Sequence, residues 1–273
     1  MTANPATAPT QWGWIKSPAF DRAAAASTVV ILPIGSTEQH GPHLPVEVDS
    51  LLVGEVAQRC AVLAAQGARP TPVLVLPTLW VSLAEHHMAE AGSLALDFET
   101  LLGFTRCIVR SLRRQGYRRI LLLNGHGGNM AALTLIVDIL TAELDVPVAT
   151  ATYWMVAAAA FAEILEAQPN LLHACEAETS MVMHLRPELV DAEAARTVSA
   201  PASGFLQAGG VHRWRPIGHW SCSGVVGTPR LASPDKGARL LRAAAAALAG
   251  RIVEGGGIWD DEGPNGAGPA APA

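Results

Sequence analysis

Apolar runs recur along the chain, and most are followed by a longer stretch in which apolar residues repeat at helical spacing. Residues 120–123 are apolar at every position, which is typical of a central strand covered on both faces. The patterns predict strands over residues 28–34, 72–78, 119–124 and 146–152. They predict helices over residues 50–66, 98–115, 129–143, 153–167, 178–186 and 234–254. This alternation favours an α/β fold with a parallel sheet and right-handed crossovers.

The two ends of the chain differ from the rest in composition. Residues 1–12 are small and polar with two prolines, and residues 262–273 are rich in glycine, proline and alanine. Such segments bury too little apolar surface to offset the entropy of ordering, so we predict mobile tails. We expect a single domain over residues 13–258, because neither a linker nor an internal repeat interrupts it.

Composition narrows the class of protein. Half of the residues are hydrophobic and 16% are charged, which predicts a compact body with a large core. The net charge of −5 offers no basic surface for nucleic acid. No apolar stretch reaches the roughly 18–20 residues of a membrane span, and the first residues lack the pattern of a signal peptide. The four cysteines have no zinc-ribbon spacing. We therefore expect a cytoplasmic protein that binds neither nucleic acid nor a membrane.

The segment after the first predicted strand carries the strongest chemical signal. Glu38 and His40 lie two residues apart, so in an extended segment their side chains share one face. Asp49 stands just before the next predicted helix, where a simple helix cap would also explain an aspartate. Burying several carboxylates together is unfavourable unless a positive charge neutralises them. The segment therefore predicts a divalent metal site, in which one bridging carboxylate could hold two ions.

A second polar cluster, residues 124–129, follows the most apolar strand and places His126 among glycines. Glycine lets the backbone turn sharply and approach a ligand closely. A glycine-rich turn before a helix can also bind phosphate, but this one matches neither the dinucleotide nor the P-loop pattern. Since ligands of parallel sheets gather at the carboxyl ends of the strands, we expect His126 to join the metal site.

The third cluster contains His173, Glu176 and Glu178 at the start of a predicted helix. Acidic residues there can simply complement the helix dipole, but this leaves His173 unexplained. In the functional interpretation, one glutamate completes the metal site and His173 transfers a proton. Two divalent ions are balanced by Glu38, Asp49, Glu178 and one hydroxide, although a single ion stays an alternative.

Together these clusters resemble the creatininase family, the creatinine amidohydrolase-like metal hydrolases. The likeness runs from about residue 28 to about residue 250, and Glu85–His87 adds to it. The resemblance implies a three-layer α/β/α domain with a mostly parallel central sheet, commonly assembled as a hexamer. It also implies two divalent ions per subunit, zinc or manganese, with iron or magnesium as alternatives.

The resemblance also assigns roles by position. Glu38, Asp49 and His126 would hold one ion, and His40, Asp49 and Glu178 the other, with Glu176 as the alternative to Glu178. His173 corresponds to the family histidine that gives a proton to the leaving nitrogen. The residues that we expect around the substrate are His43, His86, Gly127, Gly128 and Trp154.

One departure from the family pattern bears on the substrate. In creatininase proper, the second ion's carboxylate lies two residues after the histidine of the third-strand motif, and here that position is Gly128. We therefore expect not creatininase itself but an amidohydrolase that opens a non-peptide C–N bond of a small cyclic amide, or a related small molecule, through a metal-bound hydroxide. The alternatives are a peptidase- or deformylase-like member of the family and a non-catalytic scaffold protein.

Overall fold

The computed structural model describes residues 10–20, 25–66, 70–200, 213–253 and 258–259. A sheet of four parallel strands forms its centre, in the order β2–β1–β3–β4. The strands are β1 (Val29–Ile34), β2 (Val73–Val75), β3 (Arg119–Asn124) and β4 (Val148–Thr152). The predicted parallel sheet is confirmed, and the two most apolar strands, β1 and β3, pair at its middle.

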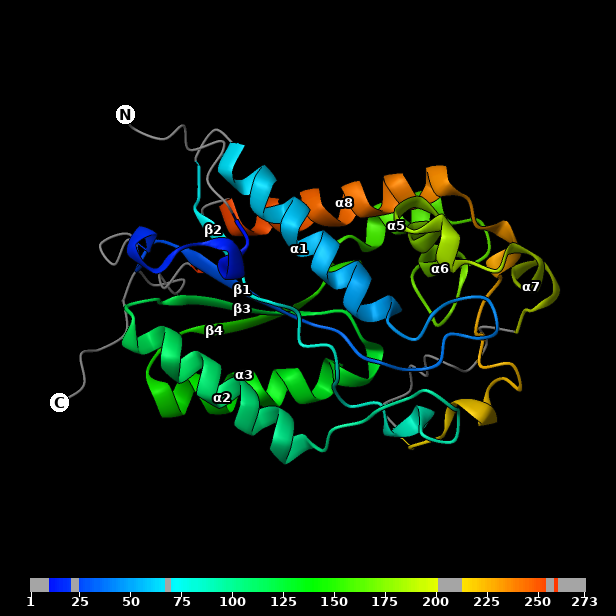
Figure 1. The fold of residues 1–273 in the computed structure, drawn as a ribbon, viewed down its shortest axis with the longest axis horizontal. Helices are drawn as coiled ribbons and strands as arrows, with labels where there is room; N and C mark the ends of the chain where they lie inside the picture. Colours follow the sequence, from blue (N-terminus) through cyan, green and yellow to red (C-terminus); the bar gives the residue numbers. More distant parts are fainter. Residues whose placement is uncertain (1–9, 21–24, 67–69, 201–212, 254–257, 260–273) are drawn as a thin grey trace.

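Helices cover both faces of this sheet, so the expected three layers are confirmed (Figure 1). One layer contains α1 (Val48–Gln66), α4 (Tyr153–Val156), α5 (Ala158–Ile164), α6 (Glu176–Leu185) and α8 (Pro234–Val253). The other contains α2 (Phe98–Arg114) and α3 (Met130–Leu144). Alternate residues of β1 point to opposite faces of the sheet. Val29 and Ile31 pack in the core under the first layer of helices, and Val30 and Leu32 pack in the core under the second. The short helix α7 (Ala192–Thr197) follows α6.

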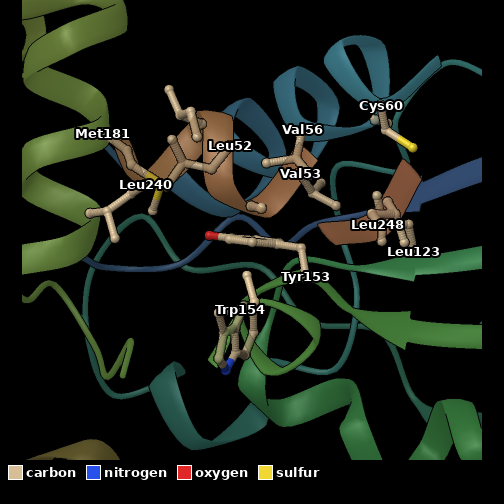
Figure 2. Close-up of a cluster of buried hydrophobic side chains, with 14 of the residues drawn as sticks. Leu52, Val53, Val56, Cys60, Leu123, Tyr153, Trp154, Met181, Leu240 and Leu248 are labelled. Carbon is tan, nitrogen blue, oxygen red and sulfur yellow. The ribbon is translucent and has the colours of Figure 1, made fainter. Parts of the chain in front are cut away.

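The core beside α1 and α8 fixes the helices that carry site residues (Figure 2). Leu52 and Val56 of α1 meet Leu240 of α8, and Met181 of α6 joins the same cluster. Tyr153 enters it from the carboxyl end of β4. Burying such side chains contributes about 25 cal/mol for each Å² of apolar surface removed from water. This packing therefore holds the first turns of α1 and α6 over the sheet edge.

Two predicted elements are shorter than expected. The helix over 153–167 is divided at Ala157, and α5 ends at Ile164 because the amides of Glu166 and Ala167 donate to the Glu176 carboxylate instead. The strand over 72–78 is confined to Val73–Val75, since Pro77 has no N–H to extend the ladder. In contrast, α6 begins at Glu176, two residues before its predicted start.

The N-terminal segment is ordered further out than predicted. Residues 10–12, expected in the tail, pack on the sheet: the Val75 amide donates to the Thr10 carbonyl at 2.8 Å. Thr10 Oγ1 donates to Gln58 at 2.9 Å, and the Trp12 ring lies 5.4 Å from that of Tyr117. The remainder of both predicted tails, residues 1–9 and 262–273, lies outside the described residues.

Several single-turn 3₁₀ helices complete the fold. Two of them, η4 (Glu85–His87) and η5 (Gly127–Asn129), lie at the site, and the others are η2 (Trp12–Trp14), η3 (Ser17–Ala19), η6 (Pro187–Leu189), η7 (Ile217–His219) and η8 (Pro229–Leu231). By length and composition alone, Gly127–Leu144 could cross a membrane. One such stretch is weak evidence for a membrane span. Here Leu133, Ile136 and Leu140 pack in the core, while most of the stretch lies on the outside of its layer.

Candidate metal centre

Six side chains from distant parts of the chain converge at the carboxyl ends of β1 and β3. Glu38 and His40 follow β1, Asp49 is the second residue of α1, and His126 follows β3. His173 precedes α6, and Glu178 is the third residue of that helix. All six are buried, with His173 the most exposed at 6%. The convergence that the sequence predicts is therefore present.

The donor atoms form three overlapping groups. One joins Glu38, His40 and His173, and the other two, Glu38–Asp49–His126 and His40–Asp49–Glu178, are triads that share Asp49. His126 Nδ1 lies 3.0 Å from Glu38 Oε2 and 3.0 Å from Asp49 Oδ2. His40 Nε2 lies 3.3 Å from Asp49 Oδ1 and 3.7 Å from Glu178 Oε1. Within each triad the ligand atoms all lie within 4.8 Å of one another. Asp49 thus turns one oxygen toward each triad, as a bridging carboxylate does.

The donor set fits a divalent cation. With the imidazoles neutral, as they are when they bind a metal, four atoms of the set are buried without a hydrogen-bond partner among the described residues: Glu38 Oε2, His40 Nε2, Asp49 Oδ2 and Glu178 Oε2. Each unpaired buried polar atom costs about 1–3 kcal/mol, so four in one place need a common partner. Imidazole and carboxylate donors suit zinc and manganese. One cation in each triad would satisfy all four atoms, two in each triad.

The electrostatics of the cluster also favour added positive charge. Burial lowers the pKa of His126, but the charges of Glu38 and Asp49 outweigh this and raise it to about 10. Burial likewise opposes protonation of His40, yet Asp49 and Glu178 hold its pKa well above the usual value. Burial raises the pKa of Glu178. The negative charge of the carboxylates is therefore balanced in one of two ways: the imidazoles are protonated, or they are neutral and a metal ion supplies the positive charge.

Backbone carbonyls fix the orientation of both ligand histidines. His126 Nε2 lies 3.1 Å from the Leu83 carbonyl, so its Nδ1 turns toward Glu38 and Asp49. His40 Nδ1 lies 3.1 Å from the Glu38 carbonyl, which leaves Nε2 for the centre. Ligand histidines in metal sites are commonly held in this way, through the ring nitrogen that faces away from the metal.

The structure separates the two candidate glutamates of α6. Glu176 is fully buried and points away from the centre, where Lys236 Nζ donates to it at 2.6 Å. Glu178 is the one in the triad with His40. Residues two apart on a helix project about 200° from each other, so one can be structural while the other faces the centre.

The residues expected around the substrate have different surroundings. Gly127 and Gly128 are exposed beside His126, and His86 is half-buried with its ring stacked 5.4 Å from that of His126. His43 lies behind the triads instead, fully enclosed, with Nε2 2.9 Å from Thr179 Oγ1. Trp154 is 5% exposed and packs in the core, so it offers a substrate little surface. The open side of the centre is therefore the side of His86 and the two glycines.

Gly128 is required by close packing. A Cβ atom there would lie 2.5 Å from His126 Nε2 and 2.7 Å from the Leu83 carbonyl oxygen. A glutamate ligand at this position would displace the imidazole that it should assist. At Gly127 a Cβ would meet nothing within 4 Å.

Two residues that touch the centre, His87 and Gln39, lie in motifs that the sequence analysis noted but were given no role of their own there. His87 Nε2 lies 3.2 Å from Glu38 Oε1, and the Gln39 amide nitrogen lies 3.1 Å from His87 Nδ1. Burial lowers the pKa of His87 to about 2, so the ring is neutral. Adjacent histidines carry no signal that tells which one will be buried, and His86 was named in place of His87.

Sequence comparisons agree with this geometry. The family model Creatininase, described as creatinine amidohydrolase, matches residues 15–252. A mycofactocin precursor peptide peptidase of Mycobacterium tuberculosis is 31% identical over 239 residues, which cover 85% of this chain and 87% of the relative. A creatinine amidohydrolase of Pseudomonas putida is 30% identical over 251 residues, 85% of this chain and 92% of the relative.

Solved structures of creatininases have the same fold as this chain. A manganese creatininase superposes with a TM-score of 0.75 at 28% identity, over 89% of this chain and 97% of its own. A mutant creatininase of the Zn-Zn type has a TM-score of 0.75 at 27% identity, over 90% and 98%. Similar proteins thus exist with either metal.

Proposed function

Since the chain belongs to the creatininase family, whose members are hydrolases, we propose that it is a divalent-metal-dependent amidohydrolase acting on the C–N bond of a small cyclic amide or a related substrate. The observation that carries this proposal is the pair of buried triads joined by Asp49, with four lone-pair atoms left unpaired. In this proposal Glu38, Asp49 and His126 hold one ion. His40, Asp49 and Glu178 hold the other.

Each ligand type suits this role. When bound, divalent ions lower the pKa of a coordinated water to roughly 7 and polarise a carbonyl as Lewis acids. The protein contributes three buried carboxylates and orients both imidazoles through backbone carbonyls. Zinc and manganese are the metals that we propose, because both fit the donor set.

His173 is the proposed proton carrier. Burial lowers its pKa well below the usual value, so the resting ring is neutral. His173 Nε2 lies 2.9 Å from the backbone carbonyl of Gln39 and 2.9 Å from the side-chain nitrogen of Gln39, so Gln39 holds this edge of the ring. Its Nδ1 then faces the centre, 3.6 Å from Glu38 Oε1. Once protonated there, a ring with a low pKa readily gives its proton to a leaving nitrogen.

A peptide bond is the second candidate substrate. The observation that favours it is the 31% identity to a peptidase over most of both chains. The backbone of Gly127 is also exposed beside His126, with open space where a side chain would begin. Both candidates require attack on an amide carbonyl, so the same residues serve either one.

A hydrolysis screen tests the proposal. The protein is stripped with a chelator, reloaded with zinc or manganese, and offered small lactams, formamides and short peptides, with ring opening or new amine followed directly. Metal-dependent opening of a lactam supports the first candidate, and cleavage of peptides alone replaces it with the second. A fully loaded protein that hydrolyses none of them contradicts both. A homo-oligomeric state, hexameric by preference, and a cytoplasmic location stay predictions.

A further inference from the structure

The segment of residues 82–87, between β2 and α2, contributes no ligand to either triad but touches two ligands of one of them. We propose that this support segment orients the ligands of the Glu38–Asp49–His126 ion and not those of the other ion. Substitutions in the segment should therefore weaken the binding of the first ion alone. The inference rests on the proposed metal function, and it assigns to His87, Leu83 and Asn129 positioning roles that the sequence patterns did not suggest.

His87 holds one oxygen of Glu38. The Gln39 amide nitrogen can only donate, and it lies 3.1 Å from His87 Nδ1, 2.9 Å from His173 Nε2 and 3.2 Å from the Gly224 carbonyl. Because the Glu38 carboxylate can only accept, we assign one amide hydrogen to His87 Nδ1. The ring hydrogen is then on Nε2, which lies 3.2 Å from Glu38 Oε1. The Gln39 amide is itself fixed, because its Oε1 accepts the Gly41 N–H at 2.8 Å. This chain of contacts occupies Oε1 and leaves Glu38 Oε2 directed at the ion site.

Leu83 holds the ring of His126. Its carbonyl lies 3.1 Å from His126 Nε2, and its N–H donates to Asn129 Oδ1 at 3.2 Å. Asn129 Nδ2 donates in turn to Asn124 Oδ1 at 3.3 Å, which also accepts the His126 N–H at 3.0 Å. The contacts close a ring around His126. The two asparagines of residues 124–129 therefore have a structural role, because they hold in place the Leu83 carbonyl that orients the His126 ring.

The support segment is tied to the sheet at its base. Ser82 is fully buried, and its Oγ donates to the Gly35 carbonyl at 2.6 Å, directly after β1. The Leu96 N–H donates to the Ser82 carbonyl at 2.8 Å. The support segment is therefore fixed to the same strand end that carries Glu38. It can hold the ligands of this triad in place before an ion binds.

The other triad is held by different contacts. His40 Nδ1 contacts the Glu38 carbonyl, and Glu178 is placed by the first turn of α6. That turn is anchored by the Lys236–Glu176 pair at 2.6 Å and by His43 on Thr179. Lys236 therefore offers a matched control, because its loss should disturb α6 and the Glu178 side of the centre.

Zinc binding to four variants of the full chain tests this inference. The variants are H87A and H87Q, each made in the H40A background, where only the Glu38–Asp49–His126 ion can bind, and in the H126A background, where only the other can. H87A should weaken zinc affinity by about 10–100-fold in the first background and by less than about threefold in the second. H87Q, whose amide nitrogen can donate at the position of the ring Nε2, should restore most of the loss.

Each outcome has a distinct meaning. Zinc affinity is read by chelator competition and the ion count by mass spectrometry, with the thermal midpoint of the stripped protein as the folding control. Equal losses in both backgrounds, no loss in either, or no rescue by H87Q would overturn the inference while the metal function stands. A wild-type chain that binds no zinc would overturn both. The K236M variant should reverse the pattern, with its effect confined to the H126A background.

Discussion

The two halves of the metal centre are built in different ways. Glu38 and His126, in the first triad, follow adjacent paired strands of the sheet, so the short distance between β1 and β3 brings them together. Glu178, in the second triad, arrives on α6, which reaches the centre only after a long connection from β4. The first half is thus specified by strand pairing. The second depends on how helices pack, and it can vary without disturbing the sheet.

Gly128 shows why the difference matters. With a Cβ excluded at that position, the 124–129 turn supplies one imidazole to the candidate centre, and the carboxylate that we propose for the second ion comes from α6. The two ions of one centre should therefore respond separately to substitution. Asp49 is the exception, because it belongs to both triads.

The largest expected effect comes from the residue that the halves share. D49N should lose both ions and lower any metal-dependent hydrolysis by at least about 10³-fold, a range typical of removing a catalytic group. The control is D138N, at an exposed position of α3, which should behave like the wild type. Ion counts and rates on the two variants make the test, and a D49N protein with two bound ions would remove Asp49 from the bridging position.

The second prediction separates the two glutamates of α6. E178Q should weaken one ion by about 10–100-fold and leave the other in place, with little change in the stability of the stripped protein. E176Q should keep both ions, with a smaller loss of affinity than E178Q on the Glu178 side, because its amide still holds the α6 turn. It should lose about 1–3 kcal/mol of unfolding free energy, because its charge-assisted bonds to Lys236 and two amides weaken. Zinc titration and urea unfolding distinguish them, and interchanged phenotypes would reassign the ligand.

The third prediction uses two adjacent glycines as a matched pair. G128A should lower the free energy of unfolding by about 1–3 kcal/mol and weaken the ion near His126, because the new methyl group meets that ring. G127A should change stability by less than about 0.5 kcal/mol, since the space there is open. Equal effects of the two substitutions on zinc affinity would show that His126 is not confined as the structure indicates.

The smallest expected effect is on proton uptake. In the metal-free protein the neighbouring carboxylates raise the pKa of His126 to about 10, above its ordinary value near 6.5. This group therefore stabilises the metal-free fold fully below pH 6.5 and progressively less as the pH rises toward 10. Because His40 also holds a proton in the metal-free protein, the test uses the H40A variant, in which zinc binding at pH 7 should release about one proton from the His126 ring. Titration calorimetry in buffers of different ionisation enthalpy measures that release, and a value of zero would mean that His126 is already neutral.

Much of the fold could be predicted from sequence because local signals agree with tertiary structure there. β3 has the predicted bounds, since an uninterrupted apolar run has few alternatives to a central strand. Glu38, His40, Asp49 and His126 could also be found, because the carboxyl ends of paired strands must meet. The sequence does not show where α6 starts, how α5 ends on Glu176, or which of His86 and His87 is buried. Each of these depends on contacts between residues far apart in the chain.

Anomalous diffraction from zinc-loaded crystals tests the central claim most directly. The account predicts two zinc peaks in each chain, each about 2.0–2.2 Å from a different oxygen of Asp49. One should be completed by Glu38 and His126, and the other by His40 and Glu178. A single peak, or two peaks of which Asp49 binds only one, would contradict the shared centre.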